Sequence, residues 1–84
     1  MYRPPDFIIE VLSPSTGSYD WIKKYAKYLK AGVKEYWLVD PQIKVVFVHI
    51  LKDGIYEQTR YSEIDIVPVK TLPGCEINLS LVFK

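Results

Sequence analysis

The regular pattern of the chain begins with a short apolar segment, residues 7–12, that is rich in β-branched and aromatic side chains. This composition predicts a β-strand. A turn-forming cluster follows, and apolar positions then recur at spacings of three and four, which predicts an amphipathic helix. Ser18 or Asp20 can cap its beginning, and Gly32 provides its end. The predicted buried stripe of this helix consists of Ile22, Tyr25, Ala26 and Leu29.

Four further segments are predicted to be strands, because each is rich in β-branched or aromatic residues and lies between turn signals. They span residues 35–39, 43–51, 55–61 and 64–69. Asp40-Pro41 closes the first of them, and Asp53-Gly54 is typical of a tight hairpin. The tail contains an apolar stretch that is compatible with a strand or a short helix. The fold class is therefore α/β, a mixed β-sheet with one principal helix.

Two predicted strands are apolar on both faces. In residues 35–39, Tyr36 and Leu38 point one way while Trp37 and Val39 point the other, and residues 7–12 are similar. Such strands are typical of the centre of a sheet that is covered on both sides. One helix covers only one face. We therefore expect the tail, a partner subunit or a missing piece of chain to cover the other, and we expect a homo-oligomer or a truncated chain.

Size and composition restrict the class of protein. The 84 residues suffice for one small domain, which we take to be residues 1–84. A hydrophobic fraction of 49% excludes an intrinsically disordered chain. No apolar run exceeds four residues and no signal peptide is recognisable, so no membrane association is expected. Cys75 is the only cysteine, which favours a cytoplasmic location. The net charge of +1 neither requires nor excludes a nucleic-acid partner.

Glu10 is the acidic residue whose setting is least typical of a solvated surface. It alternates with Ile8 and Leu12 on one face of the first strand, and a carboxylate among apolar neighbours needs a cation, which a metal ion or a lysine can supply. The alternative is a charge that protects an edge strand. Asp6 shares this face but lies ~13 Å away along a regular strand. Because ligand oxygens lie ~2.1 Å from Mg²⁺, any second acid must come from elsewhere.

Lys24 lies beside the predicted stripe of the helix. Its long stem can reach over a neighbouring strand, although an ordinary solvated lysine is the simpler interpretation. The other helix lysines are expected to face solvent. Lysines and aromatic residues together form a basic strip, a pattern that can contact a phosphate backbone but more often is a solvated helix face. The strip comprises Lys23, Lys24, Lys27, Lys30 and Lys34, with Trp21, Tyr25 and Tyr28 interleaved.

The remaining reactive residue types are expected to be structural. His49 is the only histidine and has no second histidine with which to share a metal. Cys75 has no histidine at a telling spacing and is expected to be a small buried residue. Ser13 and Ser15 lack the His-Asp arrangement that activates a serine. The sequence contains no glycine-rich phosphate loop and no zinc-ligand spacing.

The segment over residues 5–16, PDFIIEVLSPST, resembles the signature of a large bacterial family of putative restriction endonucleases. That family belongs to the PD-(D/E)XK nuclease superfamily and has the restriction-endonuclease-like fold. The similarity continues through Asp20, Lys24 and Tyr28. It then runs through residues 32–41 and ends near Pro73-Gly74. The order and spacing agree across most of the chain.

The resemblance implies roles for two residues. Glu10 would be the acid of the (D/E)XK half-motif, a ligand of Mg²⁺. The lysine of that half-motif should stand at position 12, where this chain has Leu12; Lys24 matches the place of the lysine in members whose lysine has moved to the following helix. The implied activity is Mg²⁺-dependent hydrolysis of DNA phosphodiester bonds, with the lysine positioning and activating the attacking water.

The chain also departs from the family pattern. Members usually carry an N-terminal half with the aspartate of the PD half-motif, and this chain begins just before the (D/E)XK strand. We therefore expect a truncated nuclease domain that is inactive or weak by itself, or one whose missing layer a partner chain restores. The alternative is a non-catalytic remnant that binds itself or a full-length relative as an interaction module.

Overall fold

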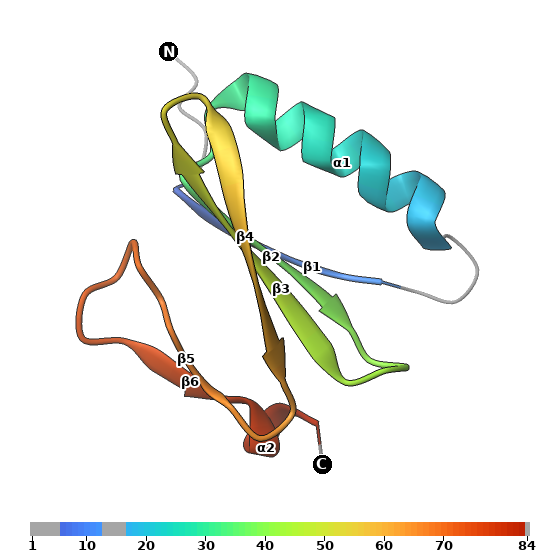
Figure 1. The fold of residues 1–84 in the computed structure, drawn as a ribbon, viewed down its shortest axis with the longest axis vertical. Helices are drawn as coiled ribbons and strands as arrows, with labels where there is room; N and C mark the ends of the chain where they lie inside the picture. Colours follow the sequence, from blue (N-terminus) through green and yellow to red (C-terminus); the bar gives the residue numbers. More distant parts are fainter. Residues whose placement is uncertain (1–5, 13–16, 84) are drawn as a thin grey trace.

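Within the residues that the computed structural model describes, 6–12 and 17–83, with the backbone alone for residues 17–21, the chain forms two β-sheets and two helices (Figure 1). This arrangement confirms the predicted α/β class with one principal helix. In chain order the elements are β1 (Phe7–Val11), α1 (Gly17–Ala31), β2 (Glu35–Asp40), β3 (Val45–Lys52), β4 (Ile55–Ser62), β5 (Ile66–Pro68), β6 (Glu76–Asn78) and α2 (Leu79–Val82).

The larger sheet is mixed and has the strand order β1-β2-β3-β4. β1 pairs with β2 in parallel, whereas β2, β3 and β4 form an antiparallel meander. Two parallel neighbours require a crossover connection, and α1 provides it. β5 and β6 form a separate antiparallel pair, so the tail contains both a strand and a short helix.

Turn chemistry follows the sequence closely. Asp53 and Gly54 both have positive φ, 53° and 84°, which are the conformations of a two-residue hairpin turn between β3 and β4. Gly32 has a φ of 77° and ends α1 as predicted. The helix begins at Gly17, so Ser18 and Asp20 lie inside it and the predicted cap is wrong.

The two faces of the larger sheet are covered by different parts of the chain (Figure 1). The helix α1 packs on one face, where Tyr28 contacts a buried cluster that includes Tyr36 and Leu38. The tail packs on the other, where Leu79 joins a cluster around Trp37. The tail is thus the first of the three coverings expected for the second face. β2, central in the sheet, is buried on both sides as predicted.

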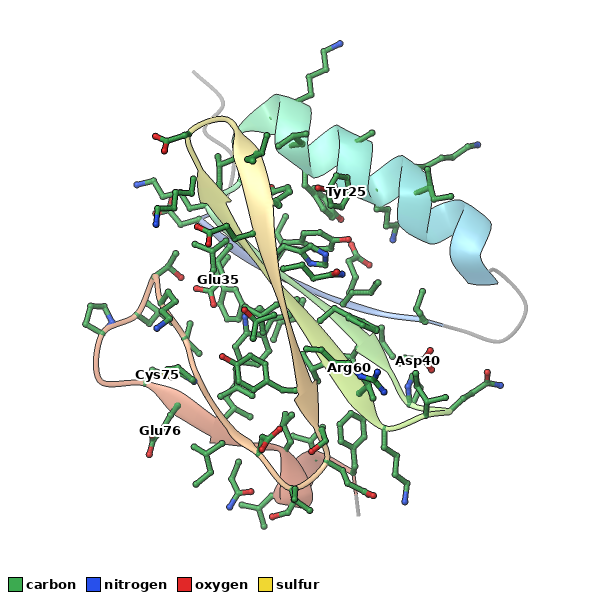
Figure 2. The ribbon with its side chains drawn as sticks, viewed as in Figure 1. Tyr25, Glu35, Asp40, Arg60, Cys75 and Glu76 are labelled. Carbon is green, nitrogen blue, oxygen red and sulfur yellow. The ribbon has the colours of Figure 1, made fainter. Side chains whose placement is uncertain are left out.

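The buried side of α1 agrees with the prediction only in part, since Tyr25 and Leu29 pack against the core but two other predicted positions do not. Ile22 is 58% exposed and Ala26 is exposed, whereas Tyr28 is buried. Figure 2 shows Tyr25 on the side of α1 that faces the sheet. The buried side of the helix is therefore centred on Tyr28, with Tyr25 and Leu29 beside it.

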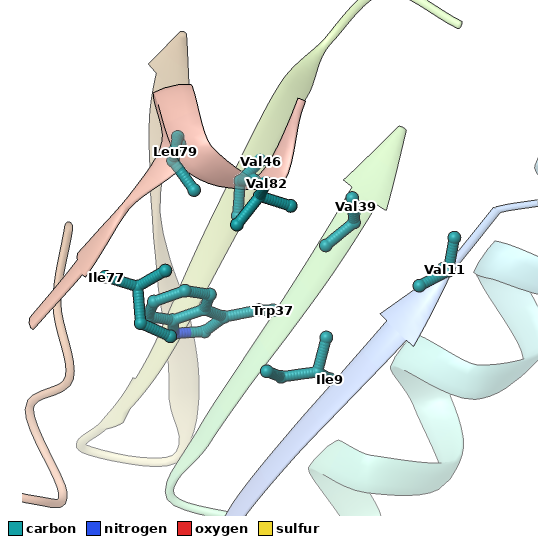
Figure 3. Close-up of a pocket in the computed structure, with 8 residues that line it drawn as sticks. All are labelled: Ile9, Val11, Trp37, Val39, Val46, Ile77, Leu79 and Val82. Carbon is teal, nitrogen blue, oxygen red and sulfur yellow. The ribbon is translucent and has the colours of Figure 1, made fainter. Parts of the chain in front are cut away.

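β1 is also placed differently from the prediction. It lies at the edge of the larger sheet in the described structure, and on its face opposite α1 the side chains of Ile9 and Val11 are 47% and 64% exposed. The tail covers β2 and β3 but only partly reaches β1. A shallow apolar groove results (Figure 3), lined by Ile9, Val11, Trp37, Val39, Val46, Ile77, Leu79 and Val82.

Candidate active site

Glu10 is the penultimate residue of β1, and its side chain projects toward α1. Neighbouring residues of a strand point to opposite faces, so Glu10 faces the helix while Ile9 and Val11 face the groove. Its side chain retains 23% exposure. The sheet register places Glu10 beside Leu38 of β2, whose side chain is buried. The carboxylate is therefore only partly solvated, as its apolar sequence neighbours predict.

Two side chains of α1 hold this carboxylate from opposite ends. Lys24 Nζ lies 2.8 Å from Glu10 Oε2, within both hydrogen-bond and ion-pair range. The Tyr28 hydroxyl donates a hydrogen bond to Glu10 Oε1. Residues four apart lie on the same side of a helix, so one face of α1 supplies both donors. The structure thus brings Glu10 and Lys24 together, and it adds Tyr28.

The electrostatics of the site favour an ionised carboxylate. Partial burial raises the pKa of Glu10, but the hydrogen bonds from Lys24 and Tyr28 and the positive charges of Lys24 and Lys27 outweigh this effect and lower the pKa below its usual value of 4.5. Glu10 is therefore negatively charged at neutral pH. Such a group can serve as a ligand for a divalent cation.

The residues present fit one ligand of a Mg²⁺ ion. A carboxylate has about four lone-pair positions, and the two donors of α1 leave others for a cation. Mg²⁺ is commonly held by one or two carboxylates together with phosphate oxygens and water. No group of three or more acidic, histidine or cysteine side chains that could hold a metal occurs among the described residues. Glu10 alone would therefore supply one ligand of such a site.

Most other candidate residues do not join this site. Asp6 is exposed and directly precedes β1. In the proposed basic strip, Tyr25 and Tyr28 face the sheet and do not interleave the lysines on an open surface. Cys75 is exposed, so the expectation of a buried cysteine is wrong. Ser13 and Ser15, together with the side chains of Trp21 and Asp20, lie outside the described residues.

His49 is a structural residue of the layer beneath α1. It is fully buried and stacks on the Tyr36 ring at 4.3 Å. Its Nδ1 lies 3.2 Å from the Tyr36 carbonyl oxygen and its Nε2 lies 3.2 Å from Gln58 Nε2. If Nδ1 donates to the carbonyl, Nε2 accepts from the amide of Gln58. Burial lowers the pKa of His49, although its backbone hydrogen bonds act in the opposite direction.

Sequence reasoning missed the roles of Tyr28 and Glu35. Tyr28 was noted only as part of a pattern, although its spacing of four from Lys24 places both on one side of the helix. Glu35 is fully buried between the sheet and the tail (Figure 2). It accepts hydrogen bonds from Trp37 Nε1 at 2.7 Å and from the Thr71 backbone N–H at 2.8 Å. Glu35 follows Lys34 at the beginning of β2, so only the apolar residues after it could have indicated its burial.

No helix within the described part of the chain is long and apolar enough to cross a membrane.

Comparison with known proteins agrees with this architecture. The crystal structure of a putative nuclease belonging to DUF820, from Anabaena variabilis, superimposes with a TM-score of 0.78 and 27% sequence identity. The match covers 98% of this chain and 45% of the other. The chain therefore spans less than half the length of that solved structure. No curated protein matches the sequence.

The sequence also matches a family over residues 1–80, nearly its whole length. The description of that family is Uma2, putative restriction endonuclease. The matched region includes β1 and α1, and hence Glu10, Lys24 and Tyr28. With its nuclease-like fold, the chain belongs to the Uma2 family of putative restriction endonucleases.

Proposed function

We propose that the chain carries part of a Mg²⁺-dependent DNA endonuclease site, in which Glu10 is a metal ligand and Lys24 a catalytic residue. The observation that supports this most directly is the 2.8 Å contact between Lys24 Nζ and Glu10 Oε2. These residues lie 14 positions apart in the sequence and on different elements. Their meeting at a partly exposed point, in a chain of this family, favours a chemical role for the pair.

Each residue would have a distinct role in phosphodiester hydrolysis. Glu10 is ionised and would hold Mg²⁺ through the lone pairs that α1 leaves open. When bound, Mg²⁺ would stabilise the negative charge of the phosphate and lower the pKa of a coordinated water. Lys24 is 37% exposed on its side chain, so its ammonium can reach an incoming phosphate oxygen or the attacking water. DNA is the substrate class implied by the family.

The isolated chain is proposed to be weak or inactive as an enzyme. Its described residues offer one carboxylate at the site, and a single carboxylate holds Mg²⁺ only with help from phosphate and water. The solved relative has more than twice as much chain as the matched region. A second acid from another polypeptide or from further chain would raise the affinity for the metal.

The metal role can be tested by calorimetric titration with Mg²⁺ or Mn²⁺. We expect weak binding by the wild type and none by Glu10→Ala. Glu76→Ala is a suitable control, since Glu76 is an exposed acid on β6 in the tail. Equal binding by wild type and Glu10→Ala would contradict the proposed ligand.

The catalytic role can be tested by nicking of supercoiled plasmid at high protein concentration. We expect Lys24→Ala to lose about 10²-fold or more of the activity, the scale of a positioned proton-transfer group. Lys30→Ala is the matched control, because Lys30 is exposed in the last turn of the same helix. Cleavage at the same rate by wild type and Lys24→Ala would indicate a contaminating nuclease and contradict the proposal.

A second candidate function, as a self-associating interaction module, is favoured by the edge position of β1. Ile9 and Val11 present apolar surface beside an edge strand, and natural proteins usually protect such edges. Antiparallel pairing of β1 with β1 of a second copy would be isologous and would cover both side chains in each copy. The occupant that we propose is therefore a second copy of this chain.

Sedimentation velocity tests this second function. We expect the wild type to associate and Val11→Lys to remain monomeric. Ile64→Lys is the control, because Ile64 is 81% exposed and lies outside the groove. A wild type that stays monomeric at high concentration would contradict self-association, and capture of a full-length relative by that monomer would favour a heterologous partner instead.

A further inference from the structure

The two donors that hold Glu10 differ in mobility. Tyr28 is 9% exposed, and its ring packs against Tyr36 with centroids 5.3 Å apart. The phenol has only two side-chain torsions and is fixed by this packing. Lys24 reaches Glu10 with a long flexible stem, and its side chain is 37% exposed. One donor is therefore rigid and the other can move.

We propose that Tyr28 is a positioning residue, whose hydroxyl fixes the Glu10 carboxylate in one orientation while Lys24 moves between Glu10 and the substrate. The proposal rests on the proposed role of Glu10 as a metal ligand. If Lys24 were the only donor, each departure of its ammonium toward a phosphate would release Glu10 to rotate. Because the Tyr28 hydroxyl donates a hydrogen bond to Oε1, the carboxylate would keep its orientation when Lys24 leaves Oε2.

The packing of the helix supports this division of roles. Phenylalanine at position 28 would satisfy the ring contacts, so the hydroxyl matters only through its polar contacts, which include the partly buried hydrogen bond to Glu10. The backbone around Tyr28 is also anchored, because the Val33 N–H donates to the Tyr28 carbonyl at 3.1 Å. The backbone and the ring of Tyr28 are therefore both held in place, and its hydroxyl lies within hydrogen-bond range of Glu10.

The matched pair of variants is Tyr28→Phe and Tyr56→Phe. Tyr56 belongs to the same aromatic layer and also loses a buried hydrogen bond on substitution, since its hydroxyl donates to the Val33 carbonyl at 2.7 Å. Tyr56→Phe thus reproduces the loss of a phenol from this layer. It leaves the hydrogen bonds from α1 to Glu10 in place.

The first readout is the side-chain rotamer of Glu10, measured by NMR scalar couplings without metal. We expect one dominant rotamer in the wild type and in Tyr56→Phe, and averaging over rotamers in Tyr28→Phe. This readout does not depend on catalysis or on metal binding. A single Glu10 rotamer in Tyr28→Phe, equal to that of the wild type, would overturn the proposal.

The second readout is Mn²⁺ affinity by calorimetry. Loss of a hydrogen bond that orients a metal ligand commonly weakens metal binding by 10–100-fold. We expect about a tenfold loss in Tyr28→Phe and no change in Tyr56→Phe. Unchanged Mn²⁺ affinity in Tyr28→Phe would also overturn the proposal. If the wild type binds no Mn²⁺, the proposed function of Glu10 fails, while the rotamer measurement still decides whether Tyr28 fixes the carboxylate.

Discussion

Two tyrosines in the layer between α1 and the sheet differ in what their hydroxyl groups contact. The Tyr56 hydroxyl donates to a carbonyl oxygen, whereas the buried Tyr36 hydroxyl has no hydrogen-bond partner among the described residues. Burial, and then the nearby Tyr56, Tyr25 and Glu10, raise the pKa of Tyr36, so its hydroxyl stays neutral. Burial of a polar group without a partner costs free energy. The Tyr36 ring, in contrast, makes a favourable contact, since it stacks on His49.

This difference predicts opposite effects for the same chemical change. Tyr36→Phe removes an unpaired hydroxyl and is expected to leave the free energy of unfolding unchanged or to raise it by up to about 1 kcal/mol. Tyr56→Phe removes a made hydrogen bond and leaves a buried carbonyl, so it is expected to lower the free energy of unfolding by about 1 kcal/mol. Urea denaturation of the two variants measures both. A larger loss in Tyr36→Phe than in Tyr56→Phe would contradict this assignment.

At the residue scale, the sequence indicates that Glu10 is unusual, because it has apolar neighbours on both sides, but not what it contacts. Glu35 follows Lys34 and lacks that signal; in the structure Glu10 contacts α1 and Glu35 contacts the tail. The difference depends on which face of the sheet each side chain occupies and on how distant segments pack there. The contact of Tyr28 with Glu10 was likewise not predicted, because a tyrosine in a helix is more often a core residue than a hydrogen-bond donor to a strand.

At the element scale, Glu35 attaches the tail to the larger sheet. Its carboxylate accepts from Trp37 of β2 and from both the backbone N–H and the hydroxyl of Thr71, which lies between β5 and β6. A fully buried carboxylate with three donors is well satisfied without a cation. These hydrogen bonds therefore attach the loop between β5 and β6 to β2, although Glu35 and Thr71 are 36 residues apart in the sequence.

Glu35→Leu is expected to loosen this connection. The apolar side chain would leave the indole N–H of Trp37 and the backbone N–H of Thr71 without their acceptor, at a cost of about 2 to 4 kcal/mol in the free energy of unfolding. Faster hydrogen exchange at the Thr71 amide is expected as well. Glu76→Ala, at an exposed site, should change the stability by no more than about 0.5 kcal/mol. Unchanged exchange at Thr71 in Glu35→Leu would rule out this role.

Elements with strong local signals were predicted well, and those placed by distant contacts were not. The Asp53-Gly54 turn follows from local sequence, because these two residue types favour the torsions of a hairpin turn. The burial of β2 follows from its consecutive apolar residues. The buried stripe of α1 was predicted only in part: Tyr25 and Leu29 pack against the core, whereas Ile22 is exposed. The predicted central position of β1 was wrong, since β1 lies at the edge of the described sheet. Apolar residues on both faces of a strand do not determine which strands lie beside it.

At the scale of the whole molecule, stability should depend on pH through two buried or partly buried groups. The pKa of His49 is lowered below its usual 6.5, chiefly by burial. The unfolded chain therefore takes up a proton at higher pH than the folded one, and stability falls as the pH drops below about 6.5. Thermal unfolding between pH 8 and pH 5 measures this loss. His49→Gln is expected to flatten that part of the profile, and an unchanged profile would contradict the assignment to His49.

A second loss of stability is expected at lower pH. The pKa of Glu10 is lowered in the folded protein, so its ionised form contributes stability that is fully present above the usual value of 4.5. That contribution disappears as the pH falls below 4.5 and through the folded pKa. In metal-free buffer, Glu10→Gln should lack this step and keep the step of His49. A wild type and a Glu10→Gln variant with parallel profiles below pH 4.5 would contradict the lowered pKa.

The alternation of side chains along β1 means that its proposed metal ligand and its proposed self-association surface lie on opposite faces of one strand. The side chain of Glu10 points toward α1, and those of Ile9 and Val11 point into the groove on the other face of the strand. Point substitutions can therefore tune either property in isolation. A slip of the strand by one residue, in contrast, would turn every side chain to the opposite face. An insertion or deletion within the five residues of β1 is therefore expected to disrupt both proposed roles together.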